Sequence, residues 1–391
     1  MAVQYRPTDI RGLTWLEQTN FGTVGAGSHA ECRARNITFE PTQNIHFAEY
    51  QKAADNRGPD QGAMGAEGGT LKFEIPLRGG GGSVPLFMEL CQGIGTYTNY
   101  NSATQVAAGA TTSSVPVDSA AGLAVGMAIM IQLGGSGTPE IRFISDVNGT
   151  TLTVEPAFSS APSENDALLD IATLHSNAIS GETGKYYQFK FYAGDKNSHN
   201  TLYTLTDCVV SWKINSAAVD TLPFIEVTAQ CDSWSITINS LLTVAADSDG
   251  STPQPMLGSN FYIDDTATEI ESFEFDPALN IVPIKDMAGT NGRSGWFCTG
   301  NQPSVKFKPY YDVTWYTKWQ TPTTFQLFLE SVKDTDDGWA WYAPSCQVTN
   351  ISQSDIEGLA AMEPEIMLLD PGTATTGGEY IPRWAIAITS A

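Results

Sequence analysis

The residues best suited to chemistry in this sequence do not form a catalytic or metal-binding pattern. The four histidines lie far apart in the chain, and none has metalloprotease or zinc-ligand spacing; they are His29, His46, His175 and His199. No Gly-x-Ser-x-Gly element is present to expose a nucleophilic serine. Paired carboxylates for glycoside cleavage cannot be picked out of 43 acidic residues. We therefore predict no catalytic, cofactor-binding or metal-binding residue, no cofactor and no enzymatic activity.

Two acidic stretches have the composition of a calcium-binding loop but not its spacing. Asp334-Thr335-Asp336-Asp337-Gly338 has its glycine one place too early, and no glutamate follows at the twelfth position. Asp247-Ser248-Asp249-Gly250 has the same character. Asp, Ser and Gly favour turns because their side chains, or the lack of one, suit turn backbones. Both stretches are predicted to be turns.

The cysteines and tryptophans predict structural roles. Six cysteines are scattered without any Cys-x-x-Cys pair, which predicts free thiols instead of a zinc site or a disulfide framework; they are Cys32, Cys91, Cys208, Cys231, Cys298 and Cys346. Several tryptophans could line a sugar-binding face, but core and interface packing is the favoured interpretation; these are Trp212, Trp234, Trp296, Trp315, Trp319, Trp339 and Trp341.

The charge of the chain limits its partners. The formal net charge is −23, and such a surface repels nucleic-acid phosphates and anionic lipid. This argues against a protein that binds DNA, but not against one that lets DNA slide past. The first residues predict no secretory signal. The longest apolar run, Ala120–Ile131, is too short to cross a bilayer.

Alternating apolar residues and frequent glycine and proline predict an all-β protein with an internal repeat. Tyr187–Val210 and Phe325–Val348 share one pattern: an alternating strand, a polar turn, an aromatic residue and a second strand through a cysteine. The offset between the two copies is constant, since Cys208 and Cys346 occupy the same place in each. We interpret this pattern as one β-hairpin used twice.

Three further matches occur in the same order along the chain. Phe39–Ile45 corresponds to Phe275–Ile281, Thr70–Phe73 to Ser304–Phe307, and Pro223-Phe224-Ile225 to Pro364-Glu365-Ile366. The offset between the copies becomes much smaller between Phe73 and Tyr187, so the first copy carries an insertion there. Within it, the strands Met127–Leu133, Ile141–Val147 and Thr150–Glu155 are predicted, the last two joined by an Asn-Gly turn.

The sequence therefore predicts an all-β fold with one short helix per repeat. Residues 1–96 and 185–250 form the first domain, 97–184 a small inserted β domain, and 251–391 the second domain. The helices are expected at Val84–Cys91 and Val313–Trp319.

The connecting segments are predicted from their composition. Residues 1–36 are expected to be an extended arm, and the polar, glycine-rich segment Asn44–Gly69 a long loop with a shorter counterpart at Pro283–Gln302. Ala245–Gly258 is the clearest linker.

The order of these features resembles the tail tube proteins of long-tailed bacteriophages. The resemblance covers nearly the whole chain as a diffuse pattern, carried by Thr70–Leu77, Val84–Cys91, Tyr187–Phe191, Leu205–Ile214 and Pro223–Val227. It implies two packed β-sheets flanked by one helix, with subunits closing side by side into rings that stack into a tube for DNA. Two tube-type domains in one chain imply a trimeric ring with pseudo-sixfold symmetry.

The resemblance also implies partners and a location. We expect the chain to bind itself and other phage tail proteins, and phage DNA to pass through a negatively charged lumen without specific binding and without membrane contact. Contact between rings is expected from the arm and from Asn44–Gly69, with the inserted domain outside the tube. The location is the virion tail, and the host cytoplasm during assembly. The alternatives are a baseplate hub, a tail terminator, a capsid decoration protein or a carbohydrate-binding β-sandwich.

Overall fold

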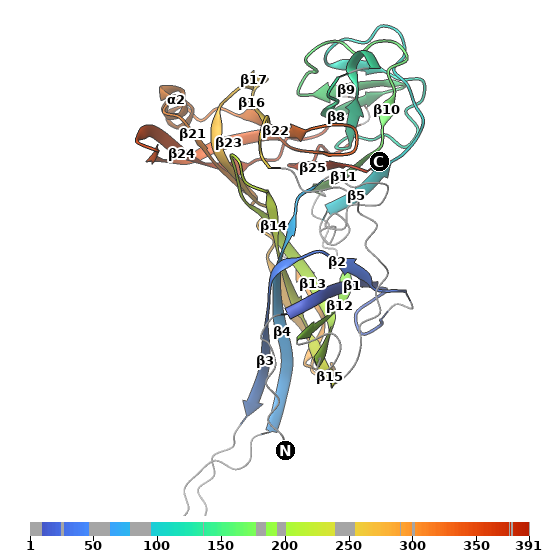
Figure 1. The fold of residues 1–391 in the computed structure, drawn as a ribbon, viewed down its shortest axis with the longest axis vertical. Helices are drawn as coiled ribbons and strands as arrows, with labels where there is room; N and C mark the ends of the chain where they lie inside the picture. Colours follow the sequence, from blue (N-terminus) through green and yellow to red (C-terminus); the bar gives the residue numbers. More distant parts are fainter. Residues whose placement is uncertain are drawn as a thin grey trace, which may run out of the picture.

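The computed structural model is built almost entirely of antiparallel β-strands, which confirms the all-β prediction (Figure 1). It describes residues 10–24, 27–46, 63–78, 95–135, 137–176, 185–193, 201–238, 255–289, 291–298, 302–374, 376 and 378–390. Among these residues there is one α-helix and no helix that could span a membrane.

The first repeat is a rolled sheet with the strand order β2-β1-β12-β13-β14-β4-β3. Its strands, with β15 continuing β14 beside β13, are β1 (Ile10–Gln18), β2 (Ala30–Cys32), β3 (Arg35–His46), β4 (Ala63–Pro76), β12 (Tyr186–Ala193), β13 (Thr201–Ala218), β14 (Phe224–Cys231) and β15 (Ser233–Ile238). Apolar residues alternate along β4 and β14, so each strand buries one face. The sheet folds over its own core, where Phe73 on β4 meets Phe189 on β12 edge to face.

The second repeat has the corresponding order β17-β16-β22-β23-β24-β21-β18. Its elements are β16 (Asn260–Ile263), β17 (Thr266–Ala267), β18 (Ile270–Asp276), β19 (Ile281–Lys285), β20 (Arg293–Cys298), β21 (Ser304–Pro309), α2 (Val313–Gln320), β22 (Phe325–Val332), β23 (Gly338–Ile356), β24 (Leu359–Leu368) and β25 (Ala385–Thr389). The helix is the one predicted at Val313–Trp319. It begins where the Asp312 side chain accepts a hydrogen bond from the Thr314 N–H.

The registers of the two repeats agree strand by strand. In the β12–β13 hairpin Phe189 lies opposite Leu205, and in the β22–β23 hairpin Leu327 lies opposite Ala343. Leu327 follows Phe189 in the chain by the same number of residues as Ala343 follows Leu205, and as Cys346 follows Cys208. Both hairpins also carry a bulge at the same place, with the extra residue on β13 between Leu205 and Cys208 and on β23 between Ala343 and Cys346. The prediction of one hairpin used twice is therefore confirmed at the level of residue pairs.

One of the predicted sequence matches has the wrong register. Thr228 on β14 lies opposite Lys72, and Glu365 on β24 lies opposite Lys306, so Glu365 corresponds to Thr228. One position earlier, Pro364 therefore corresponds to Val227 and not to Pro223. Both Pro364 and Val227 are buried, so an apolar core position explains the match better than the shared proline.

The insertion forms a five-stranded sheet of its own that packs on the second repeat. Its elements are β6 (Ser114–Pro116), β7 (Ala128–Ile131), the 3-10 turn η2 (Leu133–Gly135), β8 (Glu140–Asn148), β9 (Thr151–Glu155) and β10 (Leu168–Leu169). The flanking strands β5 (Gly95–Tyr100) and β11 (Ile171–Ser176) pair with each other, and β11 pairs with β25 of the second repeat. The inserted sheet therefore lies beside the second repeat, although the chain enters it from the first (Figure 1).

The contact between the insertion and the second repeat is buried and partly charged. Phe143 on β8 stacks on Tyr342 of β23, with ring centroids 5.4 Å apart. Beside this stack, Arg142 Nη1 lies 3.1 Å from Glu330 Oε1 of β22. Both charged side chains are almost fully buried, so the insertion is joined to the second repeat by an interior contact.

The expected N-terminal arm is wrong for residues 10–32. β1 pairs with β12, and Leu13 and Trp15 are buried in the core, because this segment alternates apolar and polar residues as a strand does. The expected loop Asn44–Gly69 is shorter than predicted, since β3 runs to His46 and β4 begins at Ala63.

Other predicted segments lie outside the described residues. They are the helix at Val84–Cys91, residues 47–62 of the predicted loop, and residues 245–254 of the predicted linker.

Candidate functional site: the junction between the repeats

The two repeats are joined edge to edge by hydrogen-bonded strands. The C-terminal half of β13 has β14 on one side and β18 of the second repeat on the other. Ile214 lies opposite Phe275, and Ala217 lies opposite Phe273. All four side chains are buried, so one sheet and one core run through the junction. The strand order across it is β3-β4-β14-β13-β18-β21-β24-β23.

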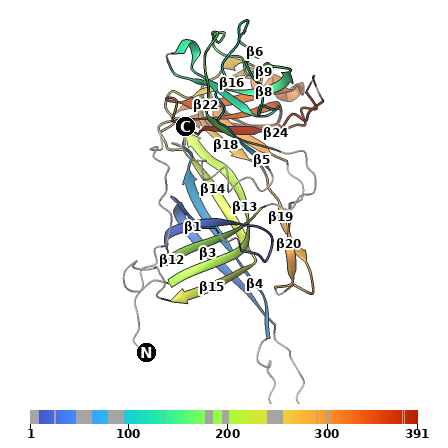
Figure 2. The same ribbon diagram turned by 90° about the vertical axis from the view of Figure 1, so that its right-hand side faces the viewer.

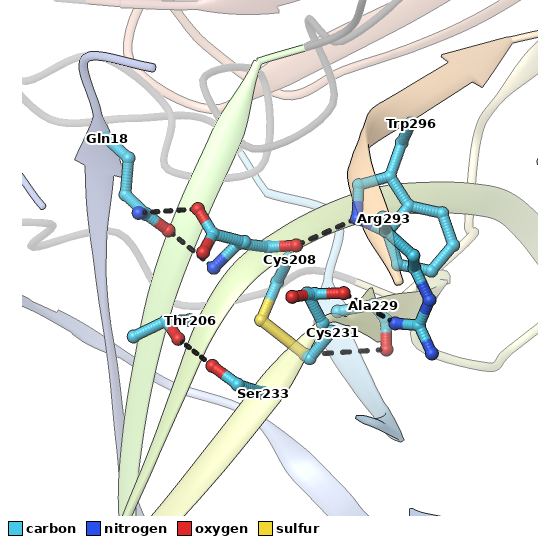
Figure 3. The surroundings of a disulfide bond; sticks show 10 residues. Gln18, Thr206, Cys208, Ala229, Cys231, Ser233, Arg293 and Trp296 are labelled. Carbon is cyan, nitrogen blue, oxygen red and sulfur yellow. Dashed lines mark hydrogen bonds and ion pairs between the residues drawn. A yellow bond between two sulfur atoms is a disulfide. The ribbon is translucent and has the colours of Figure 1, made fainter. Parts of the chain in front are cut away.

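A hairpin of the second repeat makes a further contact with the first. β19 and β20 pair with each other and extend along the first repeat (Figure 2). Arg293 Nη1 lies 2.7 Å from Asp232 Oδ1, and Asn291 Nδ2 donates to the other oxygen of that carboxylate at 3.0 Å. The indole N–H of Trp296 donates to the Asp207 carbonyl at 3.0 Å (Figure 3). These bonds fix the hairpin on the first repeat.

Asp207 is held in an unusual backbone conformation next to this hairpin. Its φ is +54°, which non-glycine residues rarely adopt. The Gln18 amide donates to Asp207 Oδ1 at 3.1 Å and accepts from the Asp207 N–H at 2.7 Å, and the Gly22 N–H donates to the same carboxylate at 2.6 Å. Burial raises the pKa of the Asp207 carboxyl, although these donors oppose the rise. The network ties β1 to the β13 bulge and so orients the carbonyl that Trp296 binds.

The prediction of free cysteines is wrong for one pair. Cys208 and Cys231 form a disulfide between β13 and β14 (Figure 3), and they are the sequence neighbours of Asp207 and Asp232. Sequence spacing did not reveal it because the two residues are well separated in the chain and meet only through strand pairing. In the second repeat Cys346 lies opposite Leu368 and is a free thiol, whose pKa burial raises far above its usual range.

The sheet face turned away from the core is dominated by carboxylates. Its strand positions carry eight acidic and five basic side chains: Glu40, Glu74, Glu226, Glu271, Glu274, Asp276, Glu363 and Glu365, with Arg35, Lys72, Lys213, Lys306 and Lys308. Four of the five cations lie within 3.0 Å of a carboxylate oxygen on the same face. The pairs are Arg35–Glu74, Lys213–Glu226, Lys306–Glu365 and Lys308–Glu271. The face is therefore net negative, and most of its cations are already paired with a carboxylate.

The histidines are not brought together in the described structure. His29 is buried between Thr14 and Gln188, and burial lowers its pKa. His175 is half-buried on a strand that flanks the insertion, and burial lowers its pKa. The His46 side chain and His199 lie outside the described part. No cluster of three or more metal-ligating side chains occurs among the described residues.

The acidic stretch before β23 is a turn, as predicted. The Asp334 carboxylate accepts hydrogen bonds from the Asp336 and Asp337 N–H groups between β22 and β23. The second predicted turn, Asp247–Gly250, lies outside the described residues.

Most of the tryptophans fill the core, as the favoured interpretation held. Trp212, Trp296, Trp315, Trp339 and Trp341 are at most 5% exposed, and only Trp319 among the seven is largely exposed. A flat sugar-binding face needs exposed rings, so the observed burial removes the reason for that alternative.

Sequence reasoning named Trp296 only as one of several packing tryptophans, and it missed the other residues that make the junction, namely Asp207, Asp232, Asn291 and Arg293. A signal was present in part, because Arg293 and Trp296 are unusual in a segment otherwise rich in Gly, Thr and Asn. Their partners could not be found, since both aspartates belong to the other repeat.

No protein-family model matches the sequence, and no curated protein matches it.

Proposed function

We propose that this chain is a structural protein of the tail of a long-tailed bacteriophage, forming stacked rings that make a tube for DNA. The observation that carries the proposal is the edge-to-edge junction of two repeats with the same strand order and register. A chain that already joins two copies of one unit through a continuous sheet has the interface needed to add further units. A ring removes the two remaining sheet edges, which would otherwise be open to non-specific pairing.

In this proposal the ring contains three chains and therefore six repeats. The chain has no catalytic role; its partners are its own copies and other tail proteins, and its place is the virion tail after assembly in the host cytoplasm. The inserted domain packs on Glu330 of β22 and on Tyr342 in the first half of β23. This hairpin lies across the core from the acidic sheet face, so the inserted domain is on the far side of the second repeat from that face. The acidic face then lines the lumen.

Electron microscopy of the purified protein tests this proposal directly. We expect rings or tubes with a uniform bore at high protein concentration. Mass per unit length from scanning transmission microscopy gives the number of chains per ring. A protein that remains strictly monomeric at high concentration contradicts the proposal.

The pairing of cations on the acidic face predicts how DNA binding can be created. In the Glu226→Gln/Glu365→Gln variant, Lys213 and Lys306 lose their ion pairs, although Glu274 and Glu363 remain near Lys306, and both ammonium groups become more available to phosphate. We expect double-stranded DNA to bind about 10-fold more tightly than to the wild type at 50 mM salt, with most of the gain lost by 200 mM. Fluorescence anisotropy with labelled DNA measures both effects.

The matched control for this experiment is Glu40→Gln/Asp276→Asn. It removes the same charge from the same face, but neither carboxylate forms an ion pair with a described cation. Equal binding by the two variants would mean that net charge alone matters and that cation pairing does not.

A further inference from the structure

The two outer edges of the joined sheet are less buried than the edges that meet inside the chain. Phe273 and Phe275 on β18 are at most 1% exposed, whereas their counterparts on β3, Ile37 and Phe39, are only partly buried. Ile214 on β13 is 1% exposed, whereas Gln353, the residue of β23 that corresponds to it, is exposed. Among the described residues, β3 pairs only with β4, and residues 347–356 of β23 pair only with β24. Each outer edge therefore lacks the neighbour that the corresponding inner edge has.

The repeat identifies which residue of β23 corresponds to Ile214. β24 follows β14 in constant register, so Glu226, which lies opposite Lys213, corresponds to Glu363, which lies opposite Ser352. A bulge in β23 after Val348 adds the one extra residue that the second repeat has before this position. Ser352 therefore corresponds to Lys213, and Gln353 to Ile214.

The correspondence on the other edge is simpler. Leu71 on β4 and Val305 on β21 hold the same place in the two repeats. Phe39 lies opposite Leu71, and Phe275 lies opposite Val305. Both β3 and β18 also carry a bulge just before this pair of positions. Phe39 therefore takes the place on the first repeat that Phe275 takes on the second.

We propose that β23 of one copy pairs antiparallel with β3 of a second copy in the register of the internal junction, with Gln353 opposite Phe39 and Ile356 opposite Ile37. This inference rests on the proposed function and specifies the contact between chains. The occupant of each edge is a second copy of this chain because only such a copy presents the other edge in matching register. The joined sheet then continues from copy to copy without a free strand.

Charge at the two edges favours the same pairing. The end of β23 carries Asp355, and Glu357 is the first residue after the strand. The start of β3 carries Arg35, which is paired with Glu74 and whose side chain is still 54% exposed. In the proposed register Glu357 lies opposite Asn36, one residue from Arg35. Opposite charges at neighbouring positions stabilise cross-strand pairs, and like charges destabilise them.

Cysteine cross-linking between separately labelled copies tests the register. Ser352→Cys and Glu40→Cys lie opposite one another in the proposed pairing, one residue from Gln353 and Phe39, and both native side chains are exposed. When the two single variants are mixed under mild oxidation, we expect a covalent dimer that neither variant gives alone. A disulfide needs Cα atoms about 4.4–6.8 Å apart, and a slip of two residues moves them apart by about 7 Å along the strand.

Two shifted mixtures serve as controls for this cross-link. Thr38→Cys and Thr42→Cys lie on the same face of β3 as Glu40, two residues to either side, and each is mixed with Ser352→Cys. We expect at least fivefold less dimer from them than from the matched mixture. Wild-type protein shows the background from the native thiols.

The outcomes separate this inference from the proposed function. Stronger cross-linking from a shifted mixture, or rings on the grid without any matched dimer, overturns the register while the tube assignment stands. Wild-type protein that forms no assemblies overturns both. A dimer from one cysteine variant alone also contradicts the inference, because it indicates a symmetric contact between identical edges.

Discussion

The Phe73→Asp substitution is expected to unfold the first repeat and abolish assembly. Phe73 is 1% exposed on β4, opposite Val227 of β14, and its ring meets Phe189 across the core. Loss of a buried Phe side chain costs about 3–5 kcal/mol, and the buried carboxylate adds a penalty of several kcal/mol more. The sum is comparable to the whole stability of a domain.

The matched control is Lys72→Asp on the same strand. Lys72 points to the exposed face, so its replacement leaves the core intact. We expect a change of at most about 1 kcal/mol in the free energy of unfolding, measured by urea denaturation with intrinsic fluorescence, and rings that still form in micrographs. Normal tubes from Phe73→Asp would show that the assignment of this face to the core is wrong.

Strands and the repeat could be predicted because their signals are local. Alternation in Thr70–Leu77 and in the two hairpins places apolar side chains on one face whatever the partner strand is. The constant offset between Cys208 and Cys346 then ties two such hairpins together, and the structure reproduces the offset in strand register.

The contacts between the repeats, and the disulfide within the first repeat, could not be predicted because each joins segments that are apart in sequence. Arg293 reaches Asp232 in the other repeat, and Cys208 meets Cys231 only after β13 and β14 pair. Composition also misled the prediction at residues 10–32. Glycines there suggested an arm, but a bulge near Gly12, at φ +65°, lets β1 bend and remain in the sheet.

The position of the insertion depends on the buried charge of Glu330, which the pattern of apolar and polar residues does not reveal. Glu330 stands within the apolar strand Phe325–Val332 and is 4% exposed. Its counterpart in the first repeat is Tyr192, so the acid is specific to the second. Its buried carboxylate accepts from the Ile141 N–H at 2.7 Å and pairs with Arg142, which also pairs with Glu140 at 2.6 Å. These bonds explain why the insertion packs on the second repeat.

The Arg142→Met substitution is therefore expected to release the insertion from the second repeat. Burial raises the pKa of Glu330, and Arg142 is the strongest influence against that rise. Without Arg142 the carboxylate is buried and unpaired, which costs about 3–5 kcal/mol. Thermal unfolding and limited proteolysis within residues 97–184 measure the loss. Lys306→Met is the control, because the ion pair between Lys306 and Glu365 is exposed. Exposed ion pairs contribute about 0–1 kcal/mol to the free energy of unfolding.

The pH dependence of the variant distinguishes an unpaired charge from lost packing. Loss of Arg142 raises the folded-state pKa of Glu330 further above the ordinary value of about 4.3. The destabilisation is then small below about pH 4.3, and it grows as the pH rises because the buried carboxyl must ionise. We therefore expect Arg142→Met to lose more stability relative to wild type at pH 8 than at pH 4. Arg142→Met/Glu330→Leu should recover most of the loss at pH 8, since no buried charge is left. A loss that is equal at both pH values and persists in the double variant would assign the contact to packing around Phe143 and Tyr342 instead.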